Sequence, residues 1–238
     1  MKGNEMILDS LAIYKPNELI FASKFYKEYL QGKVKEAAYY KALERLCKSQ
    51  ELIKIAKGVY HLPKKSKCGI VPPSDQEIIS TFVKNEKGMV VGYSLYNALN
   101  LTTQIGKSVQ VLSSNLEGQT KTIRNIMVKQ VPIKFSQDIQ NMIKGLEVLQ
   151  NFYEIQDLNC RVFIEFSKTL ANNYIEKLFI KEELYKYYKK STIAFLREIL
   201  NYYHKENNLD MYLSALSDYK HPKMEELRGI AGVTIQFM

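Results

Sequence analysis

A stretch near the N-terminus, Val34 to Pro63, combines a helical pattern with the pattern of a β-hairpin. In VKEAAYYKALERLCKS, apolar residues recur at helical spacing. Two short alternating runs, ELIKI and VYHLP, follow, and Ala56-Lys57-Gly58 separates them. Gly58 can take a positive φ there at little cost. A helix that leads directly into a tight hairpin constrains the fold more than any other part of this chain.

The residues before this stretch predict two more helices. MILDSLAIYK carries a rough apolar stripe, ELIFA is extended in character, and Ser23 is placed to cap a helix over KFYKEYL. A turn at Gly32-Lys33 leads into the third helix. Helix, short helix, turn, basic helix and hairpin is the order of a winged helix-turn-helix. In that module the last helix enters the major groove of DNA, and the hairpin contacts the backbone or the minor groove.

The positive charge of the chain is concentrated in the same region. Residues 1–68 hold 14 Lys+Arg and 7 Asp+Glu, a net of +7, whereas the other residues hold 20 and 18, a net of +2. Such an excess favours a polyanionic partner, because phosphates that are neutralised release counterions. A lysine-rich genome would raise the charge everywhere, so we predict binding to duplex DNA. The residues predicted to contact it are Ser23, Lys24, Lys33, Lys35, Tyr39, Lys41, Arg45, Lys48, Lys54 and Lys57.

A change in composition marks the end of this region. PKKSKCGIVPPSD, residues 63–75, is rich in Lys and Pro and predicts a connector rather than a fold element. We therefore predict a winged helix-turn-helix domain over 1–68 and an α+β domain over 69–238, so the fold class is α+β. In the second domain Ser74 or Asp75 is placed to cap a helix over DQEIISTFVK. The helical periodicity of its C-terminal part starts at about residue 167.

The middle of the chain predicts alternating strands and helices. MVV, SVQVLSSN and TKTIRNIMVKQVPIKF have the character of strands, and YSLYNALN has that of a helix. Three stretches, AKGVYHLPKKSKCGIVPPSDQEIISTF, GYSLYNALNLTTQI and VQVLSSN, together resemble the AbiE-type antitoxin family of type IV toxin-antitoxin (abortive infection) systems. The similarity covers about residues 10–165. Its most specific part runs from Gly92 to Gln104. The motif residues are Gly92, Ser94, Thr102, Thr103 and Gln104.

The resemblance implies a function in phage defence. It implies an N-terminal winged helix that binds the protein's own promoter and represses its own operon. It also implies a second domain that counteracts a partner toxin resembling nucleotidyltransferases, without being an enzyme itself. The residues themselves allow two interpretations of positions 102–104. Their hydroxyl and amide groups can satisfy backbone groups at the end of a helix, or they can form a surface that contacts toxin or nucleic acid.

The residues themselves do not predict an enzyme, a metal site or a cofactor. None of the three histidines lies at metal-ligand spacing from another, and the three cysteines are far apart. Phosphate-binding glycine loops and nucleophile motifs are absent from the sequence. A nucleotidyltransferase needs a Gly-Ser followed by an Asp-x-Asp pair to hold two metals, and the sequence lacks this set, so we do not expect the chain to be the toxin.

The expected location is the cytoplasm. The sequence contains no apolar run of the roughly 18 residues that a membrane span needs, and it does not start like a secretory signal. Two other functions stay open beside the antitoxin. One is a stand-alone winged-helix transcriptional regulator, and the other is a protein-binding module that uses the winged helix as a scaffold. A nucleotidyltransferase-like gene directly downstream would favour the antitoxin.

Overall fold

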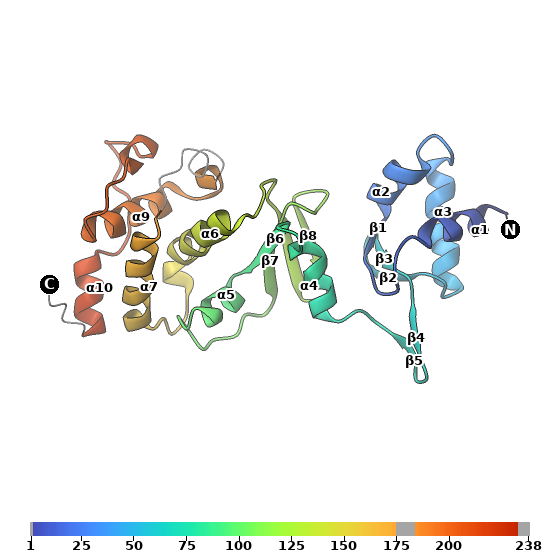
Figure 1. Ribbon diagram of the computed structural model, residues 1–238, viewed down its shortest axis with the longest axis horizontal. Helices are drawn as coiled ribbons and strands as arrows, with labels where there is room; N and C mark the ends of the chain where they lie inside the picture. Colours follow the sequence, from blue (N-terminus) through green and yellow to red (C-terminus); the bar gives the residue numbers. More distant parts are fainter. Residues whose placement is uncertain (1, 175–183, 233–238) are drawn as a thin grey trace. The chain divides into compact units, whose positions relative to one another are not determined.

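The computed structural model of the protein describes residues 2–174 and 184–232 (Figure 1). Helices contain 47% of the residues and strands contain 15%, so the fold class is α+β, as the sequence predicts. The chain divides into two compact units. The N-terminal unit comprises Met1–Gly88 and Val111–Val131, and the C-terminal unit comprises Met89–Gln110 and Pro132–Met238. This division does not fall at residue 68, and the boundary expected there stays a prediction.

The N-terminal unit begins with three helices and a small sheet. Their bounds are α1 (Lys2–Leu11), β1 (Ile20–Phe21), α2 (Ala22–Phe25), a π-helical turn (Tyr26–Leu30), α3 (Glu36–Lys48), β2 (Ile53–Ala56) and β3 (Val59–His61). The strands form an antiparallel sheet in the order β1-β3-β2. Gly58 has φ 72° in the turn between β2 and β3, as the sequence predicts. The helix over 36–48 and the hairpin after it are confirmed.

The apolar face of α3 forms the centre of this first core. Four residues of that face are buried, and they are Tyr39, Ala42, Leu43 and Leu46. They pack in one cluster with apolar residues of α1, α2 and β1. The Tyr39 ring lies 5.4 Å from the Tyr26 ring and 6.3 Å from the Phe25 ring, measured between centroids. The helical spacing that predicted α3 therefore also places its buried face.

The start of α2 differs from the prediction. The helix begins at Ala22, and Phe21 occupies the N-cap position without a side-chain hydrogen bond. Strand β1 runs directly into α2, so the capping position falls on Phe21 rather than on Ser23. The Phe21 ring instead packs 5.8 Å from the Phe82 ring. Ser23 lies inside the helix and is not a cap.

The segment predicted as a connector contains a β-hairpin. β4 (Lys64–Ser66) and β5 (Gly69–Val71) pair as antiparallel strands. All residues from Lys64 to Val71 are exposed. The prediction of a connector was wrong here, because the polar composition on which it relied reflects exposure rather than a lack of regular structure.

The next helix and the larger sheet follow the predicted segments. α4 (Asp75–Val83) is capped by Ser74, whose Oγ accepts a hydrogen bond from the Glu77 amide at 3.2 Å. The Glu77 carboxylate accepts in turn from the Ser74 amide at 2.7 Å, which completes a capping box. The sheet has the order β6-β7-β9-β8. Its strands are β6 (Gly88–Val91), β7 (Val109–Ser113), β8 (Thr120–Ile123) and β9 (Ile126–Gln130).

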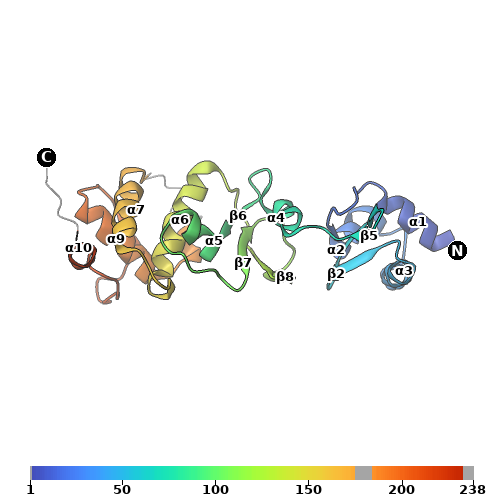
Figure 2. The ribbon, with the colours of Figure 1, turned by 90° about the horizontal axis from the view of Figure 1, so that it is seen from below.

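The rest of the described chain is mainly helical. The longer helices are α5 (Tyr93–Ala98), α6 (Gln137–Gln150), α7 (Cys160–Asn172), α9 (Lys190–Tyr202) and α10 (Met224–Ala231), and short 3-10 turns lie at Phe152–Glu154, Tyr185–Tyr187 and Leu209–Tyr212. In the C-terminal unit α6 packs against α9, and α7 packs against α10 (Figure 2). The rings of Phe152, Phe163 and Phe195 lie within 6.0 Å of one another between these helices.

The helical part of the chain starts earlier than predicted. It was expected from about residue 167, but α6 begins at Gln137 and α7 at Cys160. The buried residues of α6 include Ile139, Met142, Ile143 and Leu146, whose spacing is helical. The helical pattern expected over 175–183 lies outside the described residues.

Replacing Leu43 by alanine should destabilise the N-terminal unit by about 2 to 5 kcal/mol, because the substitution leaves a cavity in the core. Leu43 is only 1% exposed. Ile13→Ala is the matched control, since Ile13 is 59% exposed, and it should change the free energy of unfolding by less than about 0.5 kcal/mol. Urea unfolding followed by circular dichroism measures both. Equal effects of the two substitutions would mean that the buried face of α3 is misassigned.

Candidate nucleic-acid interface

α3 presents a basic stripe to solvent on the side away from its buried face. Lys41, Arg45 and Lys48 follow one another at spacings of four and three residues, so they share one face of the helix. Lys33 and Lys35 lie in the turn just before α3. All five side chains are exposed, and within residues 2–174 and 184–232 none of them forms an ion pair with a carboxylate. We call these five residues the α3 stripe.

Tyr39 lies in the core and not on this stripe. None of its surface is exposed, and its hydroxyl donates a hydrogen bond to the Ala22 carbonyl at 3.1 Å. Burial raises the pKa of the hydroxyl above its usual range, so it stays protonated. The prediction that Tyr39 contacts DNA is therefore wrong. The helical position that it occupies faces the sheet and α2, where a large ring fills the core.

Ser23 and Lys24 lie on α2 and already have acidic partners. The Ser23 hydroxyl donates a hydrogen bond to the Glu117 carboxylate, and Lys27 reaches the same carboxylate at 3.4 Å. Lys24 forms an ion pair with Glu28 at 3.9 Å. The hydrogen bond from Ser23 lowers the pKa of Glu117, so this carboxylate is charged at neutral pH. Contact of Ser23 or Lys24 with a phosphate requires these pairs to open.

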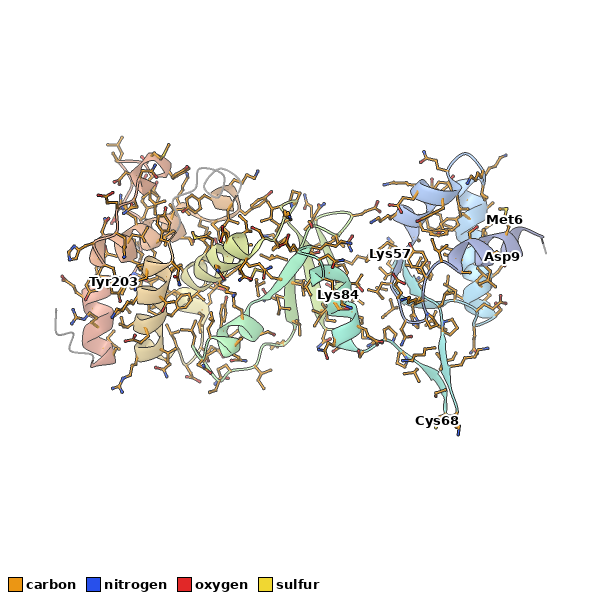
Figure 3. All side chains as sticks on the ribbon, in the orientation of Figure 1. Met6, Asp9, Lys57, Cys68, Lys84 and Tyr203 are labelled. Carbon is orange, nitrogen blue, oxygen red and sulfur yellow. The ribbon has the colours of Figure 1, made fainter. Side chains whose placement is uncertain are left out.

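Lys54 and Lys57 belong to the hairpin that follows α3. Both side chains are exposed, and Lys57 lies at the turn (Figure 3). His61, on β3, is buried, and its Nδ1 lies 2.9 Å from the Leu62 carbonyl oxygen. Burial lowers the pKa of His61, which keeps it neutral. The hairpin therefore offers two lysines to a partner, and its histidine is a core residue.

Sequence reasoning missed three exposed lysines of the β4–β5 hairpin, Lys64, Lys65 and Lys67. They were assigned to a connector. A signal was present in the sequence, because Cys68-Gly69 is followed by the β-branched pair Ile70 and Val71, a pattern typical of a tight turn and a strand.

The motif from Gly92 to Gln104 surrounds α5 in the C-terminal unit. Gly92 precedes the helix with φ 66°, and a Cβ at this position would lie 3.0 Å from the Gln110 side chain. The positive φ favours glycine, and a larger residue would also have to displace the Gln110 side chain. Ser94 is exposed in the first turn of α5. The glycine is structural, and the serine is on the surface.

Thr102 and Gln104 hold the loop after α5 in place. Thr102 is 6% exposed, and its hydroxyl donates to the Gln156 carbonyl at 2.6 Å and accepts from the Gln104 amide at 3.1 Å. The Gln104 side chain donates to the Asp157 carboxylate. Asn97 donates to the Gln104 carbonyl at 3.0 Å. These contacts match the interpretation in which the motif satisfies polar groups at the end of a helix.

The same loop also presents a surface. Thr103 is exposed, and Ile105 is 88% exposed although it is a large apolar residue. We call residues 102–105, with the 156–157 segment to which they are hydrogen-bonded, the motif corner. Thr102 and Gln104 anchor it, and they leave Thr103 and Ile105 outside. The structural and the surface interpretations thus apply to different residues of the same motif.

Metal-binding clusters and membrane-spanning helices are both absent from the described part of the chain. Its residues include no group of three or more His, Cys, Asp or Glu side chains that could hold a metal ion. Among the same residues, none of the helices combines the length and the apolar character that crossing a bilayer requires.

A family model matches most of the chain. The model of a family of unknown function (DUF6088) matches residues 7–177, which include all of the α3 stripe, both hairpins and the motif corner. No curated protein matches the chain.

Thr102→Val should destabilise the C-terminal unit by about 1 to 3 kcal/mol, because the change keeps the shape of the side chain but leaves polar backbone groups near the motif corner without a partner. Thr103→Val is the matched control, since Thr103 is exposed, and it should change stability by less than about 0.5 kcal/mol. Thermal unfolding of both variants measures the difference. If Thr102→Val unfolds like the wild type, the anchoring role of Thr102 is wrong.

Proposed function

We propose that this chain, which belongs to the DUF6088 family, is a DNA-binding antitoxin of a type IV toxin-antitoxin system. In this proposal its N-terminal part represses its own operon, and its C-terminal unit counteracts a nucleotidyltransferase-like toxin. The α3 stripe is the observation that carries the DNA-binding half. The resemblance of Gly92 to Gln104 to AbiE-type antitoxins supports the other half. The protein acts in the cytoplasm and is not an enzyme.

The order of the first elements supports a winged helix-turn-helix. α1, β1, α2 and α3 are followed by β2 and β3, and the strands form one antiparallel sheet. In winged-helix modules the helix that corresponds to α3 enters the major groove, and the turn that corresponds to β2–β3 contacts the backbone or the minor groove. The exposed side of α3 carries Lys41, Arg45 and Lys48 beside the acidic Glu36 and Glu44. The three cations have no ion-pair partner among the described residues, so they are available to phosphates.

The side chains of α3 suit both affinity and readout. Lysines of the stripe would neutralise phosphates and supply affinity that does not depend on sequence. Arg45 is the only arginine among residues 1–68, and arginine is the usual bidentate reader of guanine. Ala37 and Ala38 are exposed in the first turn of α3 and allow its N-terminal half to approach base edges closely. We infer that Arg45 reads a base and that the lysines set the register.

The motif corner is the part of the C-terminal unit that we assign to neutralisation of the toxin. Its backbone is held by hydrogen bonds, and Ile105 is exposed at its surface. Loops that a rigid scaffold holds in place often carry binding residues, and this loop is held in that way. The resemblance to the antitoxin family is most specific in this same segment.

Two measurements, binding to the promoter and protection from the toxin, separate this proposal from its alternatives. Binding to the promoter together with protection from the toxin supports the antitoxin. Binding without protection supports a stand-alone winged-helix regulator. Protection without DNA binding supports a protein-binding module that uses the winged helix as a scaffold.

Arg45→Ala should weaken binding to the protein's own promoter by about 1 to 3 kcal/mol and relax the preference at one base pair. Lys57→Ala should weaken binding to promoter and scrambled duplexes about equally, and it should reduce the salt slope by roughly one. The wild type should lose affinity on the order of a thousandfold between 50 and 200 mM salt if about six phosphates are contacted. Fluorescence anisotropy on the promoter and scrambled duplexes measures the effects of both substitutions and the salt dependence of the wild type.

Lys220→Ala is the control for these variants, because Lys220 is exposed in the C-terminal unit, and it should bind like the wild type. If Arg45→Ala and Lys57→Ala both bind like the wild type while they unfold normally, the assignment of α3 and its hairpin to DNA is wrong.

Ile105→Asp should abolish protection from the co-expressed toxin and leave promoter binding unchanged. The side chain is 88% exposed, so the substitution should not affect folding. Leu216→Asp makes the same chemical change at a side chain that is 99% exposed, and it should keep full protection. Growth of cells that co-express the toxin reports the result. Full protection by Ile105→Asp would exclude the motif corner from neutralisation.

A further inference from the structure

The β4–β5 hairpin does not carry the chain from β3 towards α4. Its strands are antiparallel, with Lys64 opposite Val71, Lys65 opposite Ile70 and Ser66 opposite Gly69. The chain therefore leaves the hairpin where it entered it. Figures 1 and 3 show it projecting from the elements around it, with Cys68 at its end. A connector needs no such projection, so the hairpin calls for a separate explanation.

The turn of the hairpin is built by local hydrogen bonds. The Ser66 hydroxyl donates to the Gly69 carbonyl at 2.9 Å and accepts from the Cys68 amide at 3.2 Å. Gly69 has φ 113°. The hairpin is therefore shaped by its own sequence, although all of its residues are exposed. An isolated two-stranded hairpin is only marginally stable in water, and a surface that it binds would stabilise it.

The charges of the hairpin are all positive. Residues 64–71 contain Lys64, Lys65 and Lys67 and no acidic residue. Successive residues of a strand point to opposite faces, so Lys64 and Lys65 lie on different faces and Lys67 lies at the turn. In the described part of the protein, none of the three lysines forms an ion pair with a carboxylate. The hairpin therefore carries free positive charge on both faces and at its end.

The Glu77 carboxylate lies near enough to Lys64 to be affected by its charge. Hydrogen bonds from Ser74 are the main cause that lowers the pKa of Glu77, and the charge of Lys64 adds to it. Because Glu77 is held by the capping box at the start of α4, it is not available as a partner for the other two lysines.

We propose that the β4–β5 hairpin is a second DNA-binding element, which contacts the phosphate backbone of the duplex beside the segment that α3 reads. This inference rests on the proposed DNA binding and extends it to residues 64–71. Three lysines on a projecting arm suit a row of phosphates, since each phosphate contact releases a counterion and none of them reads a base. The arm adds affinity and leaves sequence preference to α3.

The test compares two triple variants that remove the same charge. K64A/K65A/K67A should reduce the slope of log affinity against log salt by about 2 to 3, and it should weaken promoter and scrambled duplexes by the same factor. K168A/K189A/K220A removes three exposed lysines of the C-terminal unit and should keep the wild-type slope. K64R/K65R/K67R, which keeps the charge, should also bind like the wild type. Fluorescence anisotropy at several salt concentrations gives the slopes, and circular dichroism confirms folding.

Four results would overturn the proposal. A wild-type slope for K64A/K65A/K67A, while Arg45→Ala loses affinity, shows that the hairpin does not touch the duplex and leaves the function of α3 intact. An equal loss in both alanine triple variants shows an effect of net charge alone. If K64A/K65A/K67A binds duplex DNA like the wild type but loses binding to a structured RNA, the hairpin binds RNA. Failure of the wild type to bind any duplex refutes this proposal and the proposed DNA binding together.

Discussion

The orientation of α3 depends on one buried aromatic side chain. Tyr39 is enclosed by the rings of Phe25, Tyr26 and Tyr40, whose centroids lie 5.2 to 6.3 Å from its own. Its hydroxyl donates to the carbonyl of Ala22, at the point where β1 becomes α2. A buried ring with a satisfied polar end fixes both the depth and the rotation of its helix. Because that face of α3 is fixed inward, the lysines and Arg45 on the other face must point to solvent.

The basic excess of the N-terminal region is therefore distributed over several elements rather than one. α3 carries part of it, the β2–β3 turn carries Lys57, and the β4–β5 hairpin carries three lysines that lack an ion-pair partner in the described chain. The lysines of α2 differ, since Lys24 and Lys27 have carboxylate partners in Glu28 and Glu117. Surface pairs of this kind contribute little to stability, but they do compete with phosphates for the same cations. Net charge alone does not reveal which lysines are free.

The motif of the C-terminal unit separates anchoring from exposure within a few residues. Thr102 and Gln104 make hydrogen bonds to the segment at Gln156 and Asp157, and this holds the loop in one conformation. A loop that is fixed in this way can present Ile105 without first paying the entropy of ordering it. Motif residues that look alike in a sequence, such as Thr102 and Thr103, thus have different physical roles. One is buried and bonded, and the other faces water.

The sequence by itself determined the features that depend on near neighbours: the helix over 36–48, the turn at Gly58, a cap of α4 at Ser74 or Asp75, of which the structure selects Ser74, and the strands after residue 88. Periodicity, turn chemistry and capping act within a few residues, so the sequence expresses them directly. Only the tertiary structure decided that Tyr39 is core, that Ser23 binds Glu117 at a distance of 94 residues along the chain, and that Thr102 binds Gln156. Burial and long-range hydrogen bonds depend on which surfaces meet after folding, and no local pattern contains that information.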